Sequence, residues 1–216
     1  MAVRERFENE LKVLKGKLIE LGNLATDSLS KAFQALENQD IDTALKIIDN
    51  DTAADMLELE INDFAILLIA KQQPVAIDLR RIIVAIKIAS DIERMADFGV
   101  NIAKSAVRIG KEPFIFPLDN LKKMNEITIE MIRLSLEAFD QEDVQLAKKI
   151  AEMDDEVDAL YGENIRNILK LTNENQQQVT QLSFVARYLE RTADHATNVA
   201  ESIYYLVRGK HFDLNE

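Results

Sequence analysis

Four pairs of carboxylates, each with a spacing of four residues, are the side chains of this sequence best suited to bind a ligand. The pairs are Asp51/Asp55, Glu93/Asp97, Asp154/Asp158 and Glu190/Asp194. Residues four apart lie one turn apart on the same face of a helix, so the two negative charges of each pair repel each other. A bound cation would offset this repulsion. Hard oxygen ligands favour Mg, Ca, Mn or oxidised Fe, with Zn less favoured.

The pairs recur in the second half of the chain at fixed offsets. The pair that begins at Asp51 returns at Asp154 (154 − 51 = 103). The pair that begins at Glu93 returns at Glu190 (190 − 93 = 97). A six-residue difference in loop length reconciles the two offsets, and the pattern predicts an internal duplication of a three-helix unit.

Two asparagines extend the acidic rows and complete the predicted ligand set. Asn101 and Asn198 lie one turn beyond Asp97 and Asp194 and could add neutral oxygens. On a helical wheel the glutamates of both pairs fall at the edge of an apolar stripe. A partly buried carboxylate is unfavourable unless it is paired, protonated or bound to metal. The alternative is a solvated acidic face, or a face paired with Arg94 and Arg191.

Catalytic chemistry finds little support in the sequence. Di-iron carboxylate bundles need Glu-x-x-His on two helices. The only histidines are His195 and His211, and neither lies three residues after a glutamate. We predict no catalytic residue and interpret His195 as an ordinary polar residue near a helix surface. A carboxylate-bridged metalloenzyme and a metal-free helical adaptor stay as alternatives.

Composition narrows the class of protein. Of 216 residues 47% are hydrophobic, only 6 are Gly and 3 are Pro, and the net charge is −12. This acidic balance argues against a nucleic-acid or anionic-lipid partner. No cysteine is present, which excludes disulfides, thiolate zinc sites and iron–sulfur clusters. The charged start and the short apolar run from Phe64 to Ala70 predict a soluble, cytoplasmic protein.

Apolar spacings of three and four predict an all-α fold of six long helices. The predicted helices are Arg4 to Glu37, Asp40 to about Ile69, Val75 to Ile109, Leu118 to Phe139, Val144 to Leu171 and Gln176 to Val207. Short turns between long helices favour antiparallel packing. We therefore expect two tandem three-helix bundles, at residues 1–110 and 118–216, joined by a Pro-containing linker at residues 111–117.

Arginines near the acidic rows and at the start of the third predicted helix are candidates for a partner surface. They are Arg80, Arg81, Arg94 and Arg191. The alternative for Arg80 and Arg81 is ion pairing on the surface, which stabilises a fold little.

The segments Glu93-Arg94-Met95-Ala96-Asp97 and Glu190-Arg191-Thr192-Ala193-Asp194, in a duplicated chain of this length, resemble the PhoU family. The resemblance covers about Phe7 to Arg208. The E/D-x-x-x-D signature of that family fits at all four places. One departure is His195, which stands where the first half has Phe98 and makes the two sites unequal.

The resemblance implies a non-enzymatic, cytoplasmic protein with multinuclear metal clusters on its acidic motifs. It implies a negative regulator of phosphate-starvation signalling that acts when phosphate is ample. The implied partners are the ATPase of the phosphate ABC transporter and a phosphate sensor histidine kinase, and only through them would the protein meet a membrane. A homodimer is implied as well.

Overall fold

The computed structural model of the chain describes residues 2–171 and 175–211, and the predicted all-α class is confirmed. The helices are α1 (Ala2–Glu37), α2 (Ile41–Asp49), α3 (Thr52–Gln72), α4 (Ile77–Ile109), α5 (Asp119–Gln141), α6 (Val144–Ile168), the 3₁₀ turn η1 (Leu169–Leu171) and α7 (Gln176–Arg208). Among these described helices, none is long and apolar enough to cross a bilayer.

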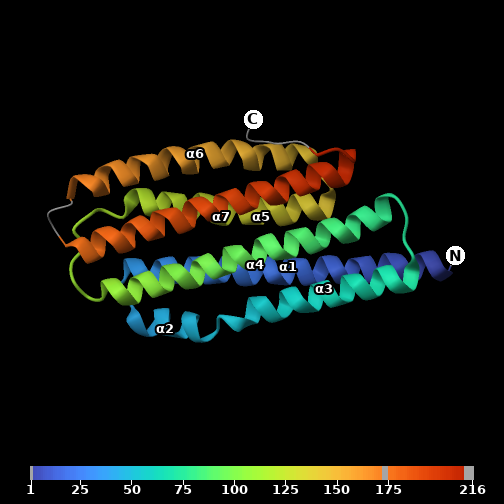
Figure 1. Cartoon of the computed structure of the whole chain (residues 1–216), viewed down its shortest axis with the longest axis horizontal. Coiled ribbons are helices and arrows are strands. Elements are labelled where there is room, and N and C mark those ends of the chain that lie inside the picture. The colour runs from blue at the N-terminus through green and yellow to red at the C-terminus, as the bar shows by residue number, and fades with distance from the viewer. Residues whose placement is uncertain (1, 172–174, 212–216) are drawn as a thin grey trace.

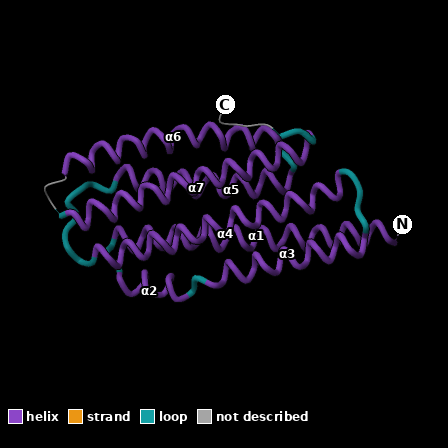
Figure 2. The backbone as a smooth tube through the Cα atoms, viewed as in Figure 1, coloured by secondary structure: helices purple, strands orange, loops and turns teal. Residues whose placement is uncertain are grey.

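The helices are stacked in four layers along one long axis (Figure 1). Helices α1 and α4 of the first half pack against α5 and α7 of the second half, and this group of four forms the centre of the molecule. Helices α2 and α3 cover one side, while α6 covers the other. Short loops join α1 to α2, α3 to α4 and α5 to α6 (Figure 2). The predicted pair of tandem three-helix bundles is therefore confirmed.

The second predicted helix is not continuous, which corrects the prediction of one helix from Asp40 to Ile69. It is interrupted at Asn50 and Asp51, between α2 and α3. The Asn50 N–H donates to the carbonyls of Lys46 and Ile47, and the chain turns tightly there. Asparagine and aspartate favour helix ends over helix interiors. The matching position in the second half is Met153, and α6 runs through it without a break.

Helices α1 and α4 approach closely because α4 carries a glycine at their crossing. A Cβ atom on Gly99 would lie 2.9 Å from the backbone nitrogen of Leu29. The α1 side of this contact is apolar, and Leu18, Leu21 and Leu29 are completely buried. This close contact fixes α4, which carries Glu93 and Asp97, against the rest of the first bundle.

The connection between the bundles, residues 110–118, is held by a side chain from α7. Gln178 accepts from the Ile115 N–H (3.1 Å) and donates to the Pro113 carbonyl (3.0 Å). Gly110 has a positive φ of 75°, a conformation that an L-residue with a side chain rarely adopts. The predicted linker at residues 111–117 lies within this non-helical segment.

Candidate metal centre

Three carboxylates from two helices meet on the surface of the first repeat. Oxygen atoms of Asp55 on α3 and of Glu93 and Asp97 on α4 all lie within 4.8 Å of one another. Asp55 is exposed, whereas Glu93 and Asp97 are half-buried. Because α3 and α4 are consecutive antiparallel helices, the acidic rows on their facing edges come together. This acidic triad suits one or more hard cations. No second group this tight occurs among the described residues.

Asp51 lies beside the triad because of the break between α2 and α3. It occupies the N-cap position of α3 but accepts no capping hydrogen bond from that helix. Its Oδ2 atom lies 3.9 Å from the Lys104 ammonium of α4. Its charge also acts on Asp97. Asp51 therefore adds negative charge at the edge of the triad.

The electrostatics of the first cluster favour a positive ion. Burial raises the pKa of Glu93, and the nearby Asp97 charge raises it further. Burial likewise raises the pKa of Asp97, followed by the charges of Asp51 and Asp55. Arg94 opposes both shifts, since it lies 3.3 Å from an Asp97 oxygen and 3.5 Å from a Glu93 oxygen. Arg94 is largely exposed, so its compensation is weakened by solvent.

The four predicted acids of the second repeat lie near one another in the matching place. They form a looser group than the triad, and two of them are more deeply buried. Glu190 and Asp154 are buried, with 8% and 4% of their surfaces exposed. Burial raises the pKa of Glu190 to about 7, and the charge of Asp194 is the next cause. Burial and then the charge of Asp194 also raise the pKa of Asp158. The acids of this cluster thus act on one another as those of the first cluster do.

An arginine from α7 compensates part of the charge of the second cluster. Arg187 donates to one carboxylate oxygen of Glu190. The other oxygen, Oε2, is buried and has no hydrogen-bond partner within the described part of the chain. The equivalent residue in the first repeat is Ser90 (187 − 97 = 90), which has no charge. The orphaned Glu190 oxygen fits a cation, and Arg187 makes the two clusters chemically unequal.

A cavity of about 480 Å³ opens beside the first cluster. It lies between α1, α2, α3 and α4, and its lining includes Ser28, Asn50 and Asp51. In the second repeat the residues matching Ser28 and Asn50 are Met131 and Met153 (28 + 103 = 131; 50 + 103 = 153). Methionine is larger than serine or asparagine, and Met131 is completely buried. Because Asp55 is exposed and Glu93 and Asp97 are half-buried, whereas Asp154 and Glu190 are buried, the first cluster is reached from solution more easily than the second.

The two predicted asparagine ligands lie in different surroundings. Asn101 is half-buried on α4, whereas Asn198 is exposed on α7. Their role as neutral ligands stays a prediction.

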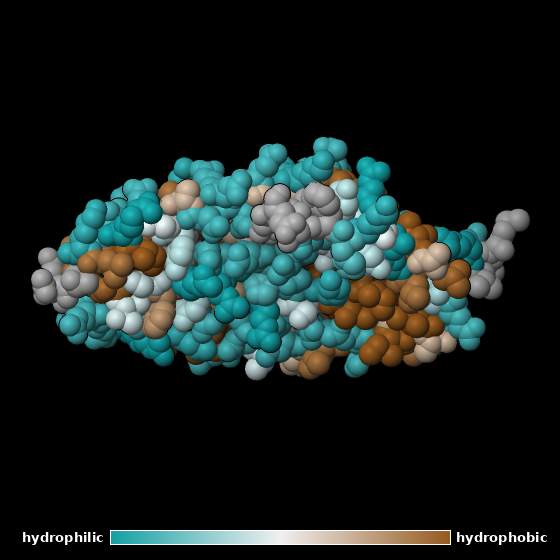
Figure 3. Space-filling view, turned by 45° about the horizontal axis from the view of Figure 1, so that its top comes forward, coloured by the Kyte–Doolittle hydropathy of each residue, from teal (hydrophilic) through white to brown (hydrophobic). Residues whose placement is uncertain are grey.

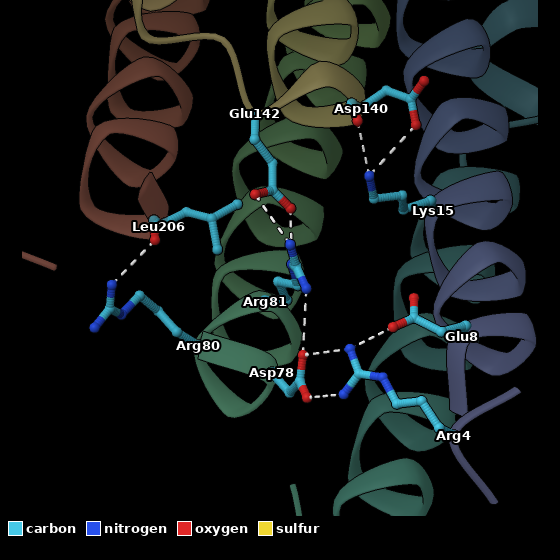
Figure 4. Close-up of polar contacts among 9 residues, drawn as sticks. All are labelled: Arg4, Glu8, Lys15, Asp78, Arg80, Arg81, Asp140, Glu142 and Leu206. Atoms are coloured by element: carbon cyan, nitrogen blue, oxygen red, sulfur yellow. Dashed lines mark hydrogen bonds and ion pairs between the residues drawn. The ribbon is translucent and has the colours of Figure 1, made fainter. Parts of the chain in front are cut away.

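The arginines assigned to a partner surface all make contacts within the chain, and Figure 4 shows those of Arg80 and Arg81. Arg81 binds both oxygens of Glu142 (2.7 and 3.2 Å) and one oxygen of Asp78 (3.2 Å). Arg80 donates to the Leu206 carbonyl at 3.1 Å. Arg191 lies over the Phe98 ring, 5.1 Å from its centroid. Arg80 and Arg81 thus join the start of α4 to the second repeat, and a role for these arginines in binding a partner stays a prediction.

Sequence reasoning did not single out Arg187. The 97-residue offset could have revealed it, because it pairs the charged Arg187 with the neutral Ser90 as equivalent positions. Arg187 also lies three residues before Glu190 on the same helix. Residues three apart on a helix are neighbours.

Known proteins resemble the chain over nearly its whole length. The sequence profile of the PhoU domain matches it twice, at residues 18–106 and 121–203. A phosphate-specific transport system accessory protein PhoU homolog of Clostridium acetobutylicum is 38% identical over 99% of both chains. Its Aquifex aeolicus counterpart is 41% identical over 96% of both chains. The crystal structure of the phosphate transport system regulatory protein PhoU from Streptococcus pneumoniae matches with a TM-score of 0.91 at 30% identity, over 96% of this chain and 99% of that one.

Proposed function

This chain belongs to the PhoU family, and from that membership we propose that it is a non-enzymatic regulator of phosphate uptake in the cytoplasm. Its relatives are named as accessory proteins of the phosphate-specific transport system. We propose that it acts on the ATPase of the phosphate ABC transporter and on a sensor histidine kinase. It would quieten the phosphate-starvation response when phosphate is ample. It would reach the membrane only through these partners.

The metal-binding part of the proposal is carried by the acidic triad. Asp55, Glu93 and Asp97 offer carboxylate oxygens from two helices within 4.8 Å of one another. A bound cation would supply the positive charge that these acids lack and would link α3 to α4. Asp51, at the edge of the triad, and Asn101 are the further candidates for ligands in this repeat.

In the second repeat the proposed ligands are Asp154, Asp158, Glu190 and Asp194, with Asn198 as a further candidate. The buried Glu190 Oε2 atom supports this assignment. Because Arg187 already neutralises part of the charge, we propose that this cluster binds a cation more weakly than the first.

The regulatory proposal is tested with the two proposed partners. Tagged chain would be incubated with the transporter ATPase and, separately, with the kinase, with and without phosphate, and the captured protein quantified. We expect both partners to be retained and retention to depend on phosphate. Failure to retain either partner in both conditions would contradict the proposal. Turnover of a generic phosphoester that disappears in Glu93→Ala would instead support the metalloenzyme alternative.

The link between metal and signalling needs a cellular measurement. A strain that lacks its own copy would carry Asp97→Asn with Asp194→Asn, and a phosphate-starvation reporter would be followed in ample phosphate. We expect reporter activity to rise, because both clusters lose a charge and a ligand while the fold stays the same. Unchanged reporter activity together with lost metal would assign the metal a bracing role only. The homodimer is proposed for this member on the family likeness alone.

A further inference from the structure

Exposed apolar side chains gather at one end of the first repeat. The described part of the chain exposes twelve large apolar residues, and nine of them come from α1, α3 and the segment from Val75 to Ile83. The most exposed within helices are Met56 (62%), Leu59 (61%) and Ile66 (60%). Figure 3 shows the apolar surface concentrated at the end where α3 stops and α4 starts. Such a contiguous apolar area on a chain with net charge −12 indicates a binding surface.

The part of this surface between α3 and α4 shares its two helical rows with the acidic triad. On α3 the row runs Asp55, Leu59, Asn62, Ile66, and on α4 it runs Leu79, Ile83, Ile86, Ser90, Glu93, Asp97. Spacings of three and four keep each row on one helix edge, and the triad fixes the register between the rows. We call Leu59, Ile66, Leu79, Ile83 and Ile86 the apolar seam. The seam therefore leads directly into the triad.

The second repeat provides an internal comparison. The positions that match the seam at offsets of 103 on α3 and 97 on α4 are Gly162, Leu169, Gln176, Thr180 and Ser183. Only Leu169 keeps a large apolar side chain. The duplicated fold therefore does not need an apolar surface at these positions, and the seam belongs to the first repeat alone.

Charge around the seam selects the kind of occupant. Helix α3 carries four carboxylates and a single lysine, and the seam ends at the triad. A second copy seated on the seam would set a second α3, with the same four carboxylates and single lysine, against the first, so that like charges would meet. Anionic lipid headgroups would be repelled. A basic partner with an apolar stripe satisfies both halves of the surface.

The length and spacing of the rows fit a helix. From Asp55 to Ile66 the α3 row spans about 16 Å, which is three turns. We propose that the apolar seam binds an amphipathic helix of a partner protein, with the partner's apolar stripe on Leu59, Ile66 and Ile83 and its Lys or Arg residues beside the carboxylates that α3 carries next to the seam. This inference rests on the proposed accessory role, since an accessory protein works through a partner.

The test uses the full chain as purified with added metal, and a fluorescein-labelled helical peptide of about 18 residues with leucines on one face and lysines on the other. Binding would be measured by fluorescence anisotropy. The double variant Ile66→Asn with Ile83→Asn should weaken binding by about tenfold or more. The matched control is Leu169→Asn, which changes the equivalent of Ile66 in the second repeat and should leave binding unchanged. A peptide with glutamates in place of lysines should bind about tenfold more weakly.

Several outcomes would overturn the inference. Equal binding by the double variant and the wild-type chain would remove the seam from the interaction. Self-association of the chain that is lost in Ile66→Asn would assign the seam to a second copy, and binding to phosphatidylglycerol vesicles that is lost in this variant would assign it to a membrane. Metal content of the same proteins separates this inference from the proposed function: the double variant should keep its metal. A chain that binds the peptide but no metal contradicts only the metal proposal.

Discussion

The Nδ1 atom of His195 on α7 lies 2.9 Å from Oδ1 of Asp91 on α4, across the contact between the two repeats. Phe98 is equivalent to His195 (195 − 98 = 97), and Tyr188 is equivalent to Asp91 (188 − 91 = 97). These two residues also meet, and their ring centroids are 6.0 Å apart. A twofold relation between the repeats produces this exchange. One of the two equivalent contacts is polar and half-buried, and the other is aromatic. His195 is thus part of the contact between the bundles, not an ordinary surface residue.

Removing the positive charge of Arg187, which pairs with Glu190 in the second cluster, should destabilise the metal-free protein. Arg187→Met leaves Glu190 buried without its partner, and we expect a loss of about 1–3 kcal/mol in the free energy of unfolding. Urea unfolding with a chelator present measures it. Lys148→Met, which removes an exposed positive charge from α6, is the control and should change stability by less than about 0.5 kcal/mol. Equal effects of the two substitutions would show that Arg187 does not compensate the cluster.

Stability without metal should fall as the pH rises from about 4.5 to about 7. Because burial raises the pKa of Glu190 to about 7, the folded chain keeps a proton on this side chain that the unfolded chain releases at lower pH. The loss levels off above about pH 7 and is at most about 3 kcal/mol from Glu190. Unfolding at pH 5 and pH 8 measures it. Glu190→Gln should reduce this pH dependence, whereas Glu152→Gln, an exposed change on α6, should retain it.

The ion pairs that join the repeats near the start of α4 should stabilise the fold measurably. Arg81→Gln breaks the contacts to Glu142 and Asp78, and we expect a loss of about 1–2 kcal/mol because all three side chains are partly buried. The control is Arg133→Gln, an exposed arginine that pairs only within α5 and should cost less than about 0.5 kcal/mol. A similar small effect for both variants would show that apolar packing, and not the ion pairs of Arg81, holds the two repeats together.

Two helical glycines should respond to alanine in opposite directions. Gly99→Ala forces a methyl group against the α1 backbone at Leu29 and should destabilise the fold by about 1–3 kcal/mol. Gly16, in the middle of α1, has no neighbour that its Cβ would meet, so Gly16→Ala should stabilise the fold by about 0.5–1 kcal/mol. Thermal unfolding of both variants measures this. A stable Gly99→Ala would contradict the close α1–α4 contact.

The sequence predicted most of the fold because long helices with strong apolar periodicity leave few alternatives. The last helix was expected at Gln176 to Val207 and is found at Gln176–Arg208. The break at Asn50 was missed, since apolar spacing continues across it and only the weak helix preference of Asn and Asp marks it. The acidic rows could be predicted from the repeat offsets, because equivalent positions in two duplicated repeats have equivalent structural environments.

What the sequence left open depends on side chains that meet across helices. The spacing rule groups Asp51 with Asp55, but the tight triad contains Asp55 and not Asp51, because the helix break displaces Asp51 to its edge. Nor could the contact of Arg81 with Glu142, 61 residues away, be derived from periodicity. Such contacts depend on how the two bundles dock, which local patterns do not encode.

The most direct test of the account is the metal content of the chain and of one isosteric variant. Wild-type protein and Asp97→Asn would be purified with added iron, manganese, magnesium, calcium or zinc and analysed by native mass spectrometry and elemental analysis. We predict more than one cation on each wild-type chain and at least one fewer in Asp97→Asn, with the first cluster losing its ion. A wild-type chain that carries no cation after purification with any of these metals would contradict the proposed metal centre.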